Sequence, residues 1–340
     1  MGEINKDSFC NAIWEETFQK INGSYDKSDY ASFTIPKKGG HRTITYLKKD
    51  SRLYNLQKKL LYNYLNKLTL PTCVHGFRLK ESYQSYLAPH IANKYFLRLD
   101  IKDFFPSLSV EFISKELQRY ISLSTDSDTE EIISLVADLV TLEGVLPQGA
   151  STSPAVSNIV MARFDQRILK YCQALEITYT RYADDLLFSS DRFDFSQKKW
   201  FIKKIKHILA DAKLRINYSK IKVSKDELSL NGYVIASNEI RLSRKRLSDI
   251  RHVLSRMNQN YEILQTQGES VFLSGINSLT LLHRNLTAYP FESLFLLIQY
   301  LCGYRAFLIS WIDPYNNASS FQKELKSLIN KIEHTIDRFS

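Results

Sequence analysis

Two adjacent aspartates, Asp184 and Asp185, are the residues of this chain best suited to chemistry. They lie between two β-prone stretches, residues 177–180 and 186–188, and two such runs around a short turn predict a β-hairpin. Adjacent like charges at a hairpin tip are costly unless a cation neutralises them. Hard divalent cations such as Mg²⁺ or Mn²⁺, which prefer oxygen ligands, meet that need. Because Asp-Asp pairs also occur in solvated turns, the partners of this pair decide its interpretation.

A third carboxylate, Asp100, lies within the apolar stretch 95–101, which predicts a buried strand. If this strand lies beside the hairpin, Asp100 meets Asp184 and Asp185. Two-metal phosphoryl transfer needs carboxylates from separate elements around ions about 3.5–4 Å apart. Taken alone, Asp100 also fits a turn or the first turn of a helix. The three residues together predict a site that binds nucleotide phosphates and metal ions.

The composition is that of a basic globular protein. The 340 residues carry a net charge of +10, with 46 Lys and Arg against 36 Asp and Glu. Such an excess favours a polyanionic partner, and the 20 Tyr and 19 Phe add rings on which bases could stack. Most of these aromatic residues are nevertheless expected in the core. Nucleic acid is the partner that this composition favours.

Cysteine usage and apolar runs indicate the compartment. The four cysteines lack metal-ligand spacing, which predicts reduced, structural thiols. The N-terminal segment lacks the apolar core of a signal peptide, and the apolar run 294–301 is too short to span a bilayer. We therefore expect a cytoplasmic protein with no membrane partner.

Hydrophobic periodicity predicts a mixed α+β centre followed by a basic helical end. Residues 32–49 alternate around the cationic segment 37–42, which predicts a β-hairpin with a basic tip. The remaining expected elements are helices at 53–68, 110–120, 153–175 and 195–212, strands at 95–101, near 221 and at 230–235, and only helices from 243 onward. Ser109 and Ser153 are the expected N-caps of their helices.

Three segments, taken in order, resemble motifs A, B and C of a reverse transcriptase palm. They are residues 99–107 (LDIKDFFPS), 146–154 (LPQGASTSP) and 182–185 (YADD). More specifically, the chain is similar to the short prokaryotic reverse transcriptases of retrons and related antiphage defence systems. Residues 74–77, 216–217 and Lys220 match that group as well, and the resemblance covers roughly residues 30–250.

The resemblance implies an α+β right-hand polymerase fold, with fingers, a palm built on an antiparallel sheet and a helical thumb. It implies an N-terminal region and fingers at residues 1–95, and a palm at 96–240 with a fingers insertion at about 110–150. The thumb is then expected at residues 241–340.

The resemblance also implies the catalytic residues. Asp100, Asp184 and Asp185 would hold two Mg²⁺ ions, or Mn²⁺, with the backbone carbonyl of Ile101 as a further ligand. Phe105 matches the steric gate that crowds a ribose 2′-hydroxyl and so favours deoxynucleotides. The family therefore implies DNA synthesis.

Other matched positions are implied to contact the nucleotide or the nucleic acid. The nucleotide-binding set adds the backbone of Asp103, the pocket residues Gln148 and Gly149, the fingers residues Lys38 and Arg42, and Lys220. Lys220 matches a palm lysine that helps to protonate pyrophosphate, although a solvated lysine at a strand edge fits the sequence equally well. The thumb residues implied to hold a template–product duplex are Arg241, Arg244, Lys245, Arg246 and Arg251. For His75 and His90, a packed or capping histidine is a simpler interpretation than a metal ligand or general base.

Two retron signatures are eroded here. An Asn-Ala-x-x-His signature is reduced to its histidine at residues 85–90, and a Val-Thr-Gly signature is reduced to Gly232. We therefore expect a reverse transcriptase that copies a cognate structured noncoding RNA into complementary DNA, in bacterial antiphage defence. A divergent retron enzyme making RNA-linked DNA is the next alternative.

Two further functions stay open. One is an untemplated or protein-primed polymerase of abortive-infection type, and the other is a non-catalytic RNA-binding scaffold. The scaffold is disfavoured because all three carboxylates are present. The expected partners are the noncoding RNA, its DNA product and deoxynucleoside triphosphates, while a separate effector protein and a homo-oligomer remain open.

Overall fold

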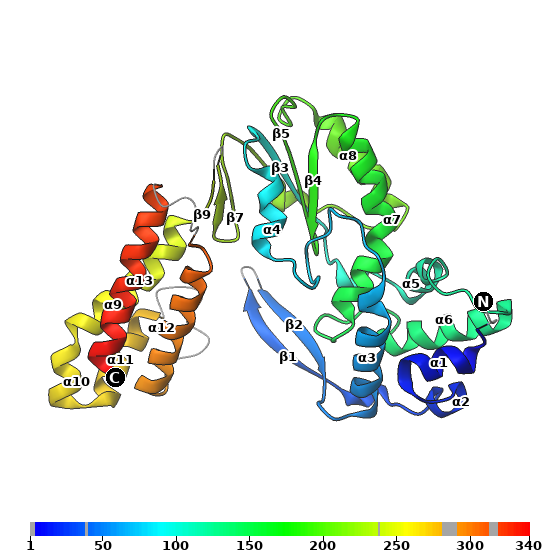
Figure 1. Ribbon diagram of the computed structural model, residues 1–340, viewed down its shortest axis with the longest axis horizontal. Helices are drawn as coiled ribbons and strands as arrows, with labels where there is room; N and C mark the ends of the chain where they lie inside the picture. The colour runs from blue at the N-terminus through cyan, green and yellow to red at the C-terminus, as the bar shows by residue number, and fades with distance from the viewer. Residues whose placement is uncertain (1–3, 38–39, 237–238, 281–290, 313–318) are drawn as a thin grey trace. The chain divides into compact units, whose positions relative to one another are not determined.

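The computed structural model describes residues 4–37, 40–236, 239–280, 291–312 and 319–340. The chain forms two compact units, residues 1–228 with 235–240, and residues 229–234 with 241–340. Helices and strands occur in both, and the strand pairs of the first unit are antiparallel, which confirms the α+β class (Figure 1). Among the described helices, none is long and apolar enough to cross a membrane.

The first unit is built around a four-stranded antiparallel sheet. Its strand order is β4 (Thr178–Tyr182), β5 (Asp185–Ser190), β3 (Tyr95–Asp100) and β6 (Lys222–Lys225). Every residue of β5 is buried, as are four of the six residues of β3. The apolar sequences of these two strands therefore place them at the centre of the sheet, with β4 and β6 at its edges.

Helices cover the sheet on both sides. Helices α7 (Ser153–Gln173) and α8 (Lys199–Ala210) run along one side, and α4 (Tyr83–Leu87) lies on the other (Figure 1). The other helices of this unit are α1 (Lys6–Trp14), α2 (Phe18–Ile21), α3 (Arg52–Asn63), α5 (Val110–Leu117) and α6 (Asp126–Val140). Their apolar faces and the sheet share one hydrophobic core.

Helix caps follow the sequence in one case and depart from it in another. Ser109 accepts a hydrogen bond from the Phe112 N–H and caps α5, as expected. The expectation for α7 was wrong, because its N-cap is Thr152. Ser153 instead donates its hydroxyl to the Pro147 carbonyl at 2.7 Å, which ties the helix start to the preceding loop.

A long hairpin joins the same unit. Strands β1 (Tyr30–Lys37) and β2 (Gly40–Leu47) pair over their whole length, which confirms the hairpin expected near residues 32–49. The basic tip, with Lys38, lies outside the described residues. Arg42 is described only as a backbone position in β2, opposite Ile35.

The second unit holds most residues of a small sheet, together with helices. The sheet order is β7 (Leu228–Leu230), β8 (Tyr233–Ile235) and β9 (Ile240–Leu242). The expected single strand at 230–235 was wrong: Asn231 and Gly232 both have positive φ, at 49° and 87°, and form a turn that reverses the chain. The helices are α9 (Arg244–Gln259), α10 (Tyr261–Gln267), α11 (Glu269–Thr280), α12 (Leu294–Ile309) and α13 (Ser320–Phe339).

His90 is a packed residue, as expected. It is fully buried, with Nδ1 2.6 Å from the Ser189 hydroxyl and Nε2 2.7 Å from the Thr180 hydroxyl. Thr180 donates its hydroxyl to the Tyr86 carbonyl, so it accepts a hydrogen bond from Nε2. Burial, with a smaller contribution from the charge of His75, lowers the pKa of His90 from 6.5 to about 3.

The buried position of His90 predicts that the protein becomes less stable in acid. The variant His90→Gln should remove this pH dependence. Since the folded pKa is depressed, the unfolded state binds more protons between about pH 6.5 and 3, and stability falls as the pH falls through that window. Urea unfolding at a series of pH values should show this loss in the native protein and a flatter profile in the variant. Parallel profiles would contradict the assignment.

Candidate active site

The two adjacent aspartates occupy the turn between β4 and β5. Ala183, in the middle of the turn, has a positive φ of 55°, and Asp184 follows it. Asp185 is the first residue of β5 and pairs with Asp100 in register, so both side chains lie on the same face of the sheet. The Ile101 N–H donates to the Asp184 carbonyl at 2.9 Å, which extends the pairing into the turn. The structure therefore brings Asp100, Asp184 and Asp185 together.

The pKa values of Asp184 and Asp185 reflect this proximity. Burial and the charge of Asp100 raise the pKa of Asp184. Burial also raises the pKa of Asp185 to about 6, against the opposing effect of the Arg98 charge, and the charge of Asp184 adds to the increase. The three carboxylates therefore lie close enough to repel one another in a largely water-excluded place.

Two basic side chains offset this repulsion. Arg98 Nε lies 2.8 Å from Asp185 Oδ1, and its NH2 lies 3.9 Å from Asp100 Oδ2. Lys220 Nζ lies 2.9 Å from the same Asp100 oxygen. Sequence reasoning matched Lys220 but missed Arg98. The signal was available, because Arg98 is two residues before Asp100 on a strand and so shares its face.

The carboxylates fit a divalent cation by their chemistry, since all of them offer hard oxygen ligands. Within the part of the chain that is described, however, no group of three His, Cys, Asp or Glu residues is arranged to hold a metal ion. The oxygens of Asp100 and Asp185 face Lys220 and Arg98 instead. A bound divalent ion would take over the neutralising role of these two cations.

The segment after Asp100 turns sharply. Asp103 has a positive φ of 47°, and its carbonyl accepts hydrogen bonds from the backbone and the hydroxyl of Ser107, at 3.0 and 2.8 Å. Phe105 follows in a short 3₁₀ helix, with its ring 5.4 Å from that of Phe104. Phe104 is buried and Phe105 only partly so. The turn therefore leaves Phe105 at the surface of the core, beside the acidic strand end.

Gln148 and Gly149 lie against the β1–β2 hairpin. The Thr45 N–H donates to the Gln148 carbonyl at 2.8 Å. Gly149 has a φ of 124°, and a Cβ at this position would lie 2.6 Å from the Thr45 carbonyl oxygen. Only glycine therefore permits this close approach of loop and hairpin.

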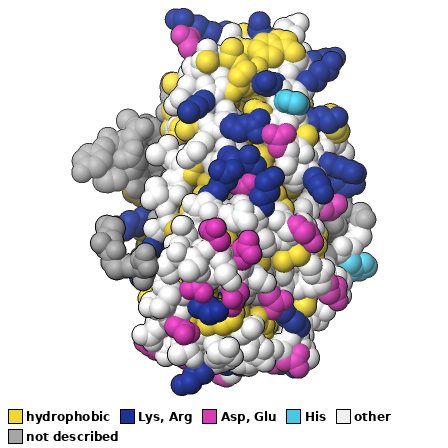
Figure 2. All heavy atoms as spheres, turned by 90° about the vertical axis from the view of Figure 1, so that its right-hand side faces the viewer, with side chains coloured by type: hydrophobic (Ala, Val, Ile, Leu, Met, Phe, Trp, Pro, Cys, Tyr) yellow, Lys and Arg dark blue, Asp and Glu magenta, His cyan; other side chains and the backbone are white. Residues whose placement is uncertain are grey.

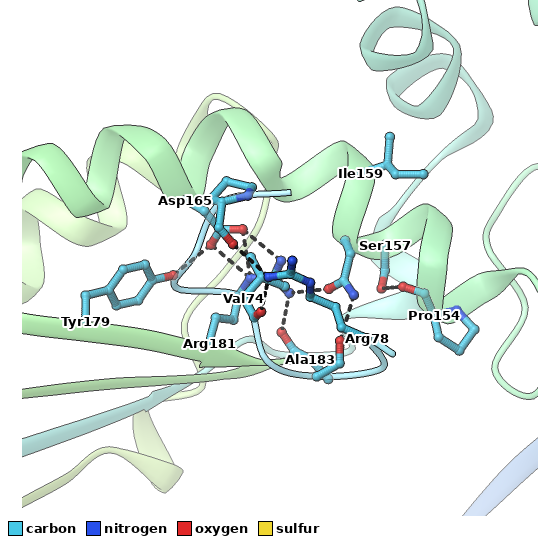
Figure 3. A network of polar contacts seen from close by, with 12 residues as sticks. Val74, Arg78, Pro154, Ser157, Ile159, Asp165, Tyr179, Arg181 and Ala183 are labelled. Carbon is cyan, nitrogen blue, oxygen red and sulfur yellow. Dashed lines mark hydrogen bonds and ion pairs between the residues drawn. The ribbon is translucent and has the colours of Figure 1, made fainter. Parts of the chain in front are cut away.

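A buried ion pair supports the turn that carries Asp184 (Figure 3). The Arg181 guanidinium binds both oxygens of Asp165, at 2.9 Å and 2.8 Å, and both residues are completely buried. Its NH1 donates to the Ala183 carbonyl at 3.0 Å and to Asn158 Oδ1 at 3.1 Å. The hydroxyl of Tyr179 donates to Asp165 at 2.8 Å. This cluster ties helix α7 to the turn that carries Asp184.

The loop at residues 74–77 joins the same cluster. Asn158 Nδ2 donates to the Gly76 carbonyl at 2.8 Å, and the His75 N–H donates to the Arg181 carbonyl at 2.9 Å. A Cβ on Gly76 would lie 2.7 Å from the Ala183 nitrogen. The sequence identified this loop only by resemblance, and the structure shows that it braces the turn.

The basic residues expected in the thumb belong to the second unit and differ in their surroundings. The Arg246 guanidinium lies over the rings of Tyr233 and Phe307, with its centre 4.8 and 4.7 Å from their centroids, and Arg251 forms an ion pair with Glu324. Arg244 and Lys245 are exposed in the first turn of α9, and Arg241 lies in β9. Arg246 therefore packs the unit together, while Arg244 and Lys245 face solvent.

The antiparallel sheet with a carboxylate-bearing strand end beside an acidic hairpin is the arrangement of a polymerase palm. The sequence profile described as "Reverse transcriptase (RNA-dependent DNA polymerase)" matches residues 35–235. A retron Ec86 reverse transcriptase from Escherichia coli is 30% identical over 296 residues, which cover 85% of this chain and 88% of that protein. A retron Mx65 reverse transcriptase from Myxococcus xanthus is 34% identical over 48% of this chain and 40% of its own length.

The chain belongs to the reverse transcriptase (RNA-dependent DNA polymerase) family, with the retron enzymes as relatives. It is an RNA-directed DNA polymerase with the right-hand α+β fold of that family, which works on an RNA template and uses divalent metal ions. Among solved structures, a Candida albicans telomerase aligns with a TM-score of 0.45 and 12% identity, over 92% of this chain and 64% of that one.

The Arg181 cluster generates a stability prediction. Arg181→Met leaves the Asp165 carboxylate buried without its cation, and this should lower the free energy of unfolding by about 3–5 kcal/mol. Combining it with Asp165→Leu removes the stranded charge and should recover a large part of the loss. Chemical denaturation of both variants measures this difference. Equal losses in the single and double variants would show that the ion pair does not govern the effect.

Proposed function

We propose that this protein is a retron-type reverse transcriptase that copies a cognate structured noncoding RNA into DNA, as part of bacterial antiphage defence. The relation to the retron enzymes supports the RNA partner, since it extends over 85% of this chain. The observation that carries the catalytic part is the register of β3 and β5, which sets Asp100 opposite Asp185.

The proposed site uses two Mg²⁺ ions, which Mn²⁺ could replace. Asp100, Asp184 and Asp185 would hold them, with the Ile101 carbonyl as a further ligand. When bound, the ions supply activation of a primer 3′-hydroxyl and neutralisation of the departing pyrophosphate. Before the ions bind, Arg98 and Lys220 balance the buried carboxylates and so keep the site folded.

The neighbouring residues would orient the nucleotide. Lys220, whose ammonium lies beside Asp100, would contact the pyrophosphate leaving group. The ring of Phe105, partly buried beside Phe104, would limit space at the sugar. Gln148 and Gly149 would line the base-pair pocket, and Lys38, Arg42 and the Asp103 backbone would contact the triphosphate.

The assignment of regions follows the same scheme. Residues 1–95 would form the N-terminal region and fingers, 96–240 the palm with its insertion at about 110–150, and 241–340 the thumb. Arg244 and Lys245, exposed at the start of α9, are the thumb cations best placed to meet phosphate groups. Arg241 and Arg251 would act beside them, and Arg246 would support them through its packing against Tyr233 and Phe307.

Removing the charge of one carboxylate should stop synthesis. We expect Asp184→Asn or Asp185→Asn to lower DNA synthesis by at least about 100-fold, because charge stabilisation in the transition state is lost, while RNA binding persists. Asp191→Asn, at an exposed position just after β5, is the matched control and should retain activity. Primer extension together with RNA binding measures both properties. Near-native synthesis by either active-site variant would refute the assignment.

Sequencing the RNA and DNA that co-purify with the protein tests the whole proposal. A DNA product complementary to part of one co-purified RNA is expected. Homopolymeric or random DNA would instead indicate untemplated or protein-primed synthesis, and the absence of DNA would favour an RNA-binding scaffold.

The steric-gate role of Phe105 has its own test. Phe105→Ala should increase the incorporation of ribonucleotides relative to deoxynucleotides in primer extension. Unchanged sugar selection in this variant would remove the gate role.

A further inference from the structure

A basic groove lies beside the end of strand β3, which carries Asp100. The groove, of about 940 Å³, is lined by the end of helix α8, by the segment 213–219 and by Lys102. All of its lining residues belong to the first unit. Neither the metal-binding carboxylates nor the nucleotide-binding residues named above line it.

The groove is fixed to the active site through the backbone. The Lys102 N–H donates to the Arg215 carbonyl at 2.8 Å, and the Asn217 N–H donates to the Asp100 carbonyl at 2.8 Å. Between them, Ile216 pairs with Ile101. The segment 213–219 therefore continues the sheet along the edge of the catalytic strand, and its exposed side chains have a set position relative to Asp100.

All charged side chains that line the groove are positive. Lys102, Lys206, Lys213 and Arg215 line it and are exposed, and no Asp or Glu is among its lining residues. In the described part of the chain, none of these four cations forms an ion pair. Lys213 does interact electrostatically with the carboxylate of Glu111. The pKa of Glu111 is lowered mainly by a hydrogen bond with Ser109, and the charge of Lys213 makes the smallest contribution.

Basic side chains also gather at the end of the first unit where helix α8 lies. Figure 2 shows Lys and Arg side chains gathered toward the top of its face, the end where Figure 1 places helix α8, while Asp and Glu side chains gather lower down. The helix itself carries Lys199, Lys203, Lys204 and Lys206. A polyanion approaching this end of the unit would meet an attractive field.

An exposed aromatic ring completes the site. Tyr218 lines the groove with 60% of its surface exposed, and Lys206 Nζ lies 6.0 Å from the centre of its ring. Cations that track a backbone beside a ring on which a base can stack are the two components of single-strand binding sites. A bare polyphosphate would use the cations but would leave the ring without a role.

We propose that this groove binds a single-stranded segment of RNA outside the active site. Lys206, Lys213 and Arg215 contact successive phosphates, and Tyr218 stacks on a base. This inference rests on the proposed RNA-directed function and adds the place where the RNA is held. Because the groove wall is hydrogen-bonded to the strand of Asp100, RNA held there keeps a constant position relative to the catalytic carboxylates.

The test measures binding of an oligouridine strand by fluorescence anisotropy across a range of salt concentrations. Each phosphate contact contributes about 0.7 to the slope of log affinity against log salt for single strands. The triple variant Lys206→Gln, Lys213→Gln, Arg215→Gln should therefore bind more weakly with a slope shallower by about 2. Tyr218→Ala should weaken binding by about tenfold without changing the slope.

A matched triple variant, Lys20→Gln, Lys67→Gln and Lys49→Gln, removes the same charge at exposed positions elsewhere in the first unit and should leave the slope unchanged. An unaltered slope in the groove variant would overturn the proposal, as would equal losses in both triple variants. Complete competition by tripolyphosphate, with no effect of Tyr218→Ala, would identify a polyphosphate site and also overturn it. Primer extension on a short template–primer is measured separately, so a failure of the polymerase function is distinguished from a failure of the groove.

Discussion

The pairing of β3 with β5 is the constraint on which the active site depends. Register alone sets Asp100 opposite Asp185, and the turn before β5 adds Asp184. A shift by one residue would turn one of the opposed carboxylates to the other face of the sheet. Both faces of β5 are buried, so such a shift would force its side chains into packed surroundings that do not fit them.

Concentrating these charges opposes folding, and the chain offsets this cost locally. Arg98 and Lys220 provide two cations for three carboxylates, which offsets most of their negative charge. Burial, together with the charges of the neighbouring carboxylates, raises the pKa values of Asp184 and Asp185.

A second ion pair, between Arg181 and Asp165, holds the turn before β5 in position. Arg181 and Asp165 are fully buried, and a buried pair of this kind contributes little net stability compared with apolar packing. Its value here lies in what else Arg181 binds, namely the carbonyl of Ala183 in the strained turn. Together with Gly76, which permits close backbone approach, it fixes the turn against α7 and the 74–77 loop. The position of Asp184 therefore depends on residues distant from it in sequence.

The sequence by itself determined the elements and the identity of the three carboxylates. Strand periodicity placed Asp100 at a strand end, the β-prone runs around residues 182–185 predicted the hairpin, and Ser109 predicted its helix start, because these signals are local. Errors at Ser153 and at residues 230–235 arose where one loop contact or two positive φ angles outweighed local preference. Only the tertiary structure decided which cations neutralise the site, that Arg181 braces the turn, and that Arg246 packs against aromatic rings. Those roles depend on which distant side chains meet in space, and spacing along one sequence does not record this.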